Sequence, residues 1–109
     1  MVYEHRTYII PPGRMHDILA RFRDHTMALF ERHGIEVVGF WVTDIGERSY
    51  GELVYICRFS DLNARQAAWE AFRADPEWVE VKARTEANGP IVARVDVKIL
   101  QATDFSPMP

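Results

Sequence analysis

The feature that most constrains the fold is that three of the four candidate strands carry apolar residues on both faces. Residues 52–59 show this best, because after the initial Glu52 the only charge on their second face is Arg58. One face holds Leu53, Tyr55, Cys57 and Phe59, and the other holds Val54, Ile56 and Arg58. A small antiparallel sheet that helices cover on one side normally presents polar residues on its other side. We therefore expect a second copy of the chain to cover the second face, which predicts a homodimer.

Two further strands are predicted from the same alternation of side chains. In residues 35–43, Ile35, Val37 and Trp41 alternate with Val38, Phe40 and Val42, so both faces are again apolar. In residues 91–100, an apolar face of Val95, Val97 and Ile99 alternates with a charged face of Arg94, Asp96 and Lys98. A strand with one polar face is typical of a sheet edge.

Helical patterns separate these strands. Residues 2–10 form a β-rich run that ends at a Pro-Pro-Gly turn. From Arg14 onward, apolar residues recur at three- and four-residue steps, which predicts one helix of about five turns that ends at Gly34. A second helix begins after Ser60 or Asp61 and runs to about Arg73, with Leu62, Trp69 and Phe72 on its inner face. A third, short helix begins at Asp75-Pro76-Glu77.

The resulting order of elements is β-α-β-β-α-β. This order predicts an α+β protein with the ferredoxin-like plait, a four-stranded antiparallel sheet with its helices on one face. We expect one domain over residues 1–100 and a C-terminal tail over residues 101–109.

Composition excludes several classes of function. The formal net charge of −3 gives no basic face for nucleic acid. No apolar run approaches the roughly 20 residues of a membrane-spanning helix, and no basic amphipathic helix is present. The single cysteine, Cys57, cannot form an internal disulfide, so a cytoplasmic location is expected. No two histidines have metal-ligand spacing, so no metal site is expected.

The first strand carries the main candidates for binding. Glu4, Arg6 and Tyr8 alternate on one face, and this face would point at the helices if Val2 and Ile10 do. The simpler interpretation is a structural Glu–Arg pair capped by Tyr8. The functional interpretation is an anion clamp, in which Arg6 binds a carboxylate or phenolate, Tyr8 donates a hydrogen bond and Glu4 orients Arg6.

Aromatic residues and one histidine complete the set of candidates. A pocket between sheet and helices could be lined by Trp41, Tyr55, Trp69, Phe72 and Trp78, although core packing would also explain them. His25 lies on the flank of the first helix's apolar stripe and is the candidate proton acceptor. His33, beside Gly34, is expected to be structural.

Four motifs resemble those of a known family. The start Glu4-His5-Arg6-Thr7-Tyr8 with Pro12-Gly13 resembles the opening of NIPSNAP-family proteins. The segments His33-Gly34 and Val38-Gly39-Phe40-Trp41, and the turn Asp75-Pro76-Glu77-Trp78, are similar to further motifs of that family. The resemblance implies a dimeric α+β barrel. It implies no settled chemistry, because the wider superfamily includes cofactor-free monooxygenases, haem-degrading enzymes, isomerases and binding proteins.

Three functions follow as hypotheses. The chain binds a small hydrophobic, aromatic or acidic molecule between sheet and helices. Alternatively, the same pocket runs a cofactor-independent oxidation or isomerisation, with Arg6 and Tyr8 stabilising an enolate or phenolate and His25 acting as base. As a third possibility, the dimer is an interaction module with a filled pocket. No cofactor is expected, because residues 78–88 lack the histidine that the haem-degrading relatives carry there.

Overall fold

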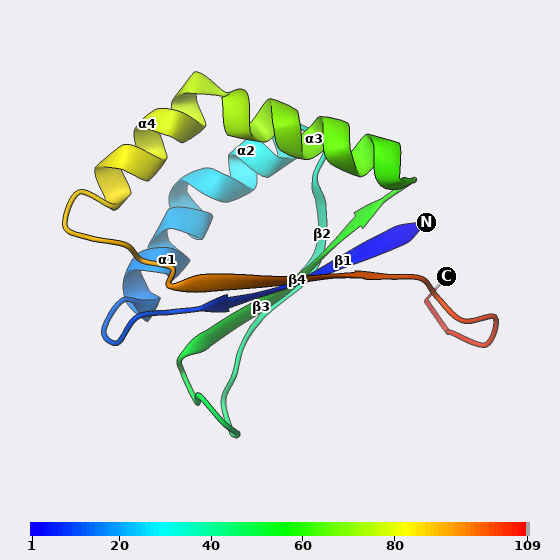
Figure 1. Ribbon diagram of the computed structural model, residues 1–109, viewed down its shortest axis with the longest axis horizontal. Coiled ribbons are helices and arrows are strands. Elements are labelled where there is room, and N and C mark those ends of the chain that lie inside the picture. The colour runs from blue at the N-terminus through cyan, green and yellow to red at the C-terminus, as the bar shows by residue number, and fades with distance from the viewer. Residues whose placement is uncertain (109) are drawn as a thin grey trace.

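Four antiparallel strands form one sheet in the order β2-β3-β1-β4, and all the helices cover one of its faces (Figure 1). The computed structural model describes residues 1–108. The strands are β1 (Val2–Ile9), β2 (Glu36–Val42), β3 (Glu52–Phe59) and β4 (Arg94–Leu100). This arrangement confirms the predicted ferredoxin-like α+β fold. We call the side that carries the helices the helix face and the other side the open face.

The first helical run spans residues 15–32 and contains a π-helical segment. It consists of α1 (Met15–Arg21), the π-helix η1 (Phe22–Thr26) and α2 (Met27–Arg32). Its buried positions Ile18, Phe22, Thr26 and Phe30 recur every four residues. In an α-helix each four-residue step overshoots a full turn by roughly 40°. The wider π turn offsets this drift, so all four side chains stay on the side of the helical run that faces the sheet.

The second pair of helices begins at Asp61, one of the two predicted alternatives for the first cap, and at Asp75, as predicted. In α3 (Leu62–Ala74), Asp61 accepts a hydrogen bond from the Ala64 backbone N–H. In α4 (Pro76–Thr85), Asp75 accepts one from the Glu77 backbone N–H. Trp69 and Phe72 of α3 are buried as expected, whereas Leu62 is exposed and was wrongly placed on the inner face.

A β-bulge in β2 overturns the alternation predicted for residues 35–43. Val37 pairs with Cys57 and Phe40 pairs with Tyr55, so the register shifts between Val37 and Gly39. Both Val37 and Phe40 therefore pack against the core. Trp41 turns to the open face, where it is 52% exposed, and its ring lies over Gly39.

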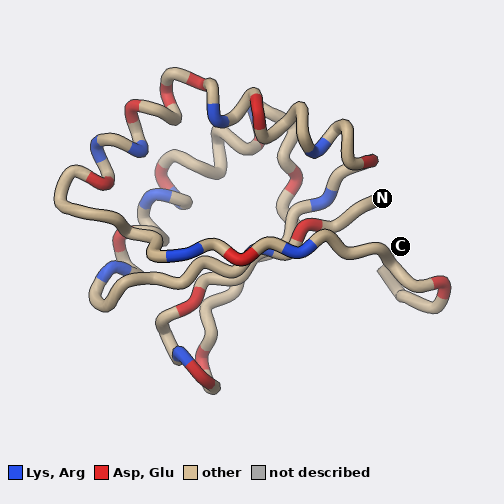
Figure 2. Tube along the Cα trace, viewed as in Figure 1, with Lys and Arg blue, Asp and Glu red and all other residues tan. Residues whose placement is uncertain are grey.

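The last strand is an edge, as predicted. Val95, Val97 and Ile99 pair with Tyr8, Arg6 and Glu4, which places this apolar row on the helix face. The row is nevertheless exposed. The alternating charges of β4, visible in Figure 2, therefore lie on the open face.

The tail also lies along the open face: a groove there is formed by Tyr3, Trp41, Ile56 and residues 101–103, 106 and 108. Pro109, the end of the predicted tail, lies outside the described residues.

Candidate functional site

Strand β1 presents Glu4, Arg6 and Tyr8 to the helices, as expected from the burial of Val2 and Ile10. Glu4 is fully buried. It accepts hydrogen bonds from Arg6 Nη1 at 2.5 Å, from Trp69 Nε1 at 2.9 Å and from Arg65 Nε. Burial acts to raise the pKa of Glu4, but these three donors outweigh it and hold the pKa below its ordinary value. Glu4 is therefore an anion that orients Arg6 from beneath.

Arg6 lies against aromatic rings on the inner wall of the site. Its guanidinium carbon is 4.5 Å from the ring centroid of Trp69, 5.8 Å from that of Tyr8 and 5.9 Å from that of Tyr55. Burial acts to lower the pKa of Arg6, but the neighbouring tyrosines and Glu4 raise it overall, so Arg6 stays charged. Its Nε is buried and has no hydrogen-bond partner among residues 1–108.

A second arginine, Arg21, lines the same cleft from the helical layer. It is only 6% exposed, and its guanidinium carbon is 5.1 Å from the ring centroid of Trp78. Its Nη1 donates to Thr85 Oγ1 at 3.3 Å and to Glu86 Oε2 at 3.4 Å. Burial lowers the pKa of Arg21. The Nε of Arg21 is also buried and unpartnered in the described part of the chain.

These residues line a cleft of about 720 Å³ between the sheet and the helices. Its walls are Arg6, Tyr8, Arg21, Phe22, Thr26, Phe30, Trp69, Phe72, Arg73, Trp78, Val79, Lys82, Ala83 and Glu86. Four of these residues are cationic and only Glu86 is acidic. The lining is thus positive although the whole chain is negative. Such a field attracts small anions.

The structure brings together most of the predicted binding residues. Arg6, Tyr8, Trp69, Phe72 and Trp78 line the cleft. Two others lie beneath it: Glu4 behind Arg6, and Tyr55, whose hydroxyl is 2.8 Å from that of Tyr8.

Two predicted site residues lie elsewhere. The β2 bulge carries Trp41 to the open face, away from the cleft. His25 lines a neighbouring groove with Asp17, Asp24 and Asn88, and Arg21 is the residue that this groove shares with the cleft. The π turn points Thr26, rather than its neighbour His25, into the cleft. No histidine is among the described residues that line the cleft.

Sequence reasoning missed Arg21. Its spacing held a signal, because Arg21 follows Ile18 by three positions and so lies on the apolar stripe of the helix. A charge at such a position requires a partner or a ligand. The partners come from α4, more than sixty residues along the chain, and could not be read from local pattern.

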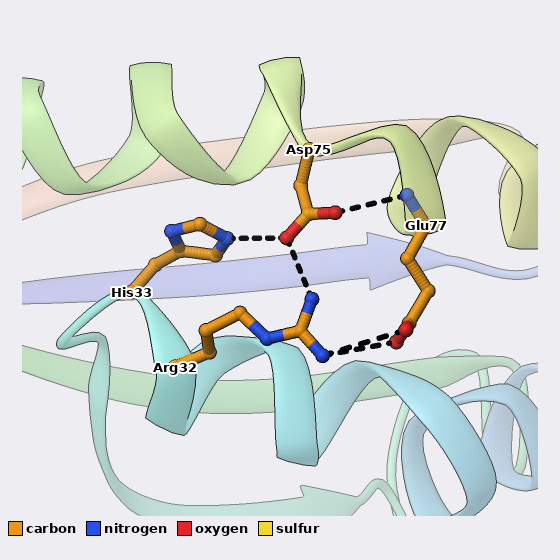
Figure 3. Close-up of polar contacts among 4 residues, drawn as sticks. All are labelled: Arg32, His33, Asp75 and Glu77. Carbon is orange, nitrogen blue, oxygen red and sulfur yellow. Dashed lines mark hydrogen bonds and ion pairs between the residues drawn. The ribbon is translucent and has the colours of Figure 1, made fainter.

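Polar contacts around His33 and Asp75 connect the helices that cover the cleft (Figure 3). His33 Nε2 lies 2.7 Å from Asp75 Oδ2, and Arg32 Nη1 donates to the same oxygen at 2.9 Å. Arg32 also reaches Glu77 at 3.4 Å. The contact with His33 contributes most to lowering the pKa of Asp75 to about 2, and the Glu77 backbone N–H and Arg32 lower it further. The network joins the end of α2 to the corner between α3 and α4, so His33 has the structural position expected of it.

Residues 1–108 contain no cluster of three or more His, Cys, Asp and Glu side chains able to hold a metal ion. Among the same residues, no helix has the length and apolar character needed to cross a membrane. Cys57 is buried, and its burial raises the pKa of the thiol to about 12, which keeps the thiol protonated.

Comparison with known proteins identifies the family. The sequence profile of the NIPSNAP family matches residues 3–107. The chain belongs to the NIPSNAP family. This NIPSNAP chain is 30% identical over 78 residues to mouse (Mus musculus) protein NipSnap homolog 3B. The match spans 72% of this chain and 30% of the mouse protein.

Solved structures agree with this assignment. A NIPSNAP family protein of unknown function from Agrobacterium tumefaciens superposes with a TM-score of 0.86 at 28% identity, covering 100% of this NIPSNAP chain and 94% of that one. An antibiotic biosynthesis monooxygenase superposes with a TM-score of 0.57 at 16% identity, covering 94% and 99% of the two chains. The second similarity shows a shared fold only.

Proposed function

We propose that this NIPSNAP protein binds a small aromatic or hydrophobic acid in the cleft between sheet and helices. One observation carries the proposal. In residues 1–108, the only buried side-chain nitrogen or oxygen atoms without a hydrogen-bond partner are the Nε atoms of Arg6 and Arg21, and both residues line this cleft. An unpaired buried donor costs about 1–3 kcal/mol, so an acceptor is expected there.

The walls of the cleft support the aromatic or apolar part of the ligand. Tyr8, Phe22, Trp69, Phe72 and Trp78 offer ring faces around the two arginines. Ligand sites commonly have volumes of roughly 300–1,000 Å³ and combine apolar walls with a few polar groups, and this cleft has both properties. An acid with a flat apolar body matches this lining.

The alternative functions have less support. A cofactor-independent oxidation or isomerisation could use Arg6 and Tyr8 to stabilise an enolate or phenolate, but its expected base, His25, lies in a different groove. An interaction module without a ligand should have its pocket filled by side chains, which the cleft of about 720 Å³ argues against.

A fluorescent aromatic acid tests the proposal. Trp69 and Trp78 line the cleft and Trp41 does not, so a Trp41→Phe background makes the remaining tryptophan emission a reporter of the cleft. We expect energy transfer from these tryptophans to 8-anilinonaphthalene-1-sulfonate. Arg6→Gln and Arg21→Gln should each weaken its binding about tenfold, the effect of losing one charge-assisted contact. Binding that neither change weakens would refute the proposal. Native mass spectrometry of the protein as purified should reveal a bound natural acid as a defined added mass.

We also propose that the protein is a homodimer that pairs through its open face. The support is an uncovered apolar surface that includes Val38, Trp41, Val54, Ile56 and Leu100, beside which the tail lies. A sheet face of this kind is normally covered in the folded assembly. Light scattering coupled to size-exclusion chromatography measures the assembly directly, and a stable monomer at micromolar concentration would refute this proposal.

A further inference from the structure

We infer that Glu86 is an internal competitor of the ligand. It pairs with Arg21 when the cleft is empty, and the acidic group of a bound molecule takes its place on Arg21. This inference rests on the proposed function, since it concerns how the same cleft admits an acid. It assigns a specificity-determining role to Glu86, which sequence reasoning did not select.

The contacts of Arg21 are weak for a buried charge. Arg21 is 6% exposed, yet its two polar contacts, to Thr85 and Glu86, measure 3.3 and 3.4 Å and both use Nη1. Charge-assisted hydrogen bonds are normally about 2.7–2.9 Å long, and arginine often makes two of them to one carboxylate. The chain makes such a pair elsewhere, because Arg58 binds Glu36 through two nitrogens at 2.5 and 2.9 Å. The pairing of Arg21 is therefore incomplete.

The two carboxylates beside the cleft arginines differ in how firmly they are held. Glu4, the partner of Arg6, is fully buried and accepts hydrogen bonds from three side chains, so it cannot leave. The Glu86 side chain is 25% exposed and follows the last residue of α4. Its second contact is with Lys82 Nζ at 3.9 Å, which offers it an alternative cation. Glu86 can therefore turn to water and Lys82 without becoming an unpaired buried charge.

Arg21 would remain in position after Glu86 left. Its guanidinium lies over the ring of Trp78, a contact that does not depend on Glu86. Its backbone belongs to the continuous helical run of residues 15–32. An incoming carboxylate or sulfonate would meet a fixed cation whose Nε is still free. An uncharged ligand could not replace Glu86, so exchange at Arg21 selects for acids.

The test measures Glu86→Gln with a matched pair of probes in the Trp41→Phe background. The anionic probe is 8-anilinonaphthalene-1-sulfonate, and the neutral probe is N-phenyl-1-naphthylamine, which has the same rings and no sulfonate. We expect Glu86→Gln to lower the Kd of the anionic probe about threefold to tenfold, as the loss of a partly exposed competing charge predicts. The Kd of the neutral probe should stay within about twofold.

Glu80→Gln is the control for net charge. Glu80 lies on α4, the helix that Glu86 follows, but is exposed, pairs with Arg84 at 3.0 Å and does not line the cleft. If Glu80→Gln tightens anion binding as much as Glu86→Gln, or if Glu86→Gln leaves binding unchanged or weaker, Glu86 is not a competitor.

The same data separate this inference from the proposed function. Anion binding that Arg21→Gln weakens, but that Glu86→Gln does not strengthen, overturns the role of Glu86 alone. An anionic probe whose binding depends on neither Arg6 nor Arg21 overturns both.

Discussion

The hydroxyl groups of Tyr8 and Tyr55 lie 2.8 Å apart at the point where the sheet meets the cleft. Tyr8 lines the cleft, and Tyr55 is fully buried on the adjacent strand. Burial, together with Tyr8, raises the pKa of Tyr55 well above its ordinary value, so Tyr55 stays a neutral phenol. The buried tyrosine thus holds the hydroxyl of its partner in a fixed place.

Replacing Tyr55 by Phe should destabilise the protein because it removes one half of this partly buried hydrogen bond. We expect the free energy of unfolding to fall by about 1 kcal/mol, measured by urea denaturation. Tyr50→Phe is the matched control, because its hydroxyl bonds Asp44 in an exposed loop. Equal effects of the two changes would mean that the buried pair does not stabilise the fold.

Replacing Glu4 by Gln should be far more damaging. The new amide side chain would carry no charge, so Arg6 and Arg65 would both lose the carboxylate that they share. Removing one partner of a buried ion pair costs about 3 kcal/mol or more. We expect a corresponding loss in the free energy of unfolding, measured by urea denaturation. Glu36→Gln, which breaks the exposed pair with Arg58, should cost much less. A Glu4→Gln variant as stable as Glu36→Gln would contradict this account.

Asp75 should make stability depend on pH in acid. Its folded-state pKa, about 2, lies below the ordinary value of 3.8. The unfolded chain therefore binds the proton more readily, so the stabilisation is complete above about pH 4 and is lost as the pH falls toward 2. Asp75→Asn keeps an N-cap oxygen but cannot titrate. We expect it to flatten the rise of unfolding free energy between pH 2 and pH 4.

His33→Gln provides the second half of this test. His33 is the largest contributor to the lowered pKa of Asp75, and the two are joined by the 2.7 Å contact in Figure 3. We expect this variant to reduce the slope of stability against pH in the same window. If neither variant changes the slope, the titration of Asp75 does not control acid stability.

Short-range sequence patterns predicted the helix caps and the direction of the side chains on β1. Asp75 was predicted as a cap, and Asp61 as one of two alternatives with Ser60, because an N-cap needs only a side-chain oxygen and the next few backbone N–H groups. The direction of Glu4, Arg6 and Tyr8 followed from the strict period of two in a regular strand.

The features that were missed break a period or join distant segments. The bulge after Val37 adds one residue to β2, which moved Phe40 to the core and Trp41 to the open face. Thr26 lies on the apolar stripe and faces the cleft, whereas His25, the candidate proton acceptor on the flank of the stripe, does not line it after the π turn. The π turn has no signature in a single sequence, whereas Gly39, an isolated glycine inside a strand pattern, is the kind of signal that often marks a bulge. The place of Arg21 on the apolar stripe was a local signal, but its partners on and just after α4 could be known only from the tertiary structure.

Replacing Ile56 by Glu should disrupt the proposed dimer. Ile56 lies on the open face of β3, a central strand, between its partners Gly39 and His5. If a second copy covers this face, the new carboxylate would be buried without a partner in the interface, which is strongly unfavourable. We expect aggregation or a large fall in melting temperature, measured by light scattering and thermal unfolding. Leu62→Glu makes the same chemical change at an exposed helical position and should be tolerated. If Ile56→Glu were instead a folded monomer with unchanged melting, the open face would not be the dimer interface.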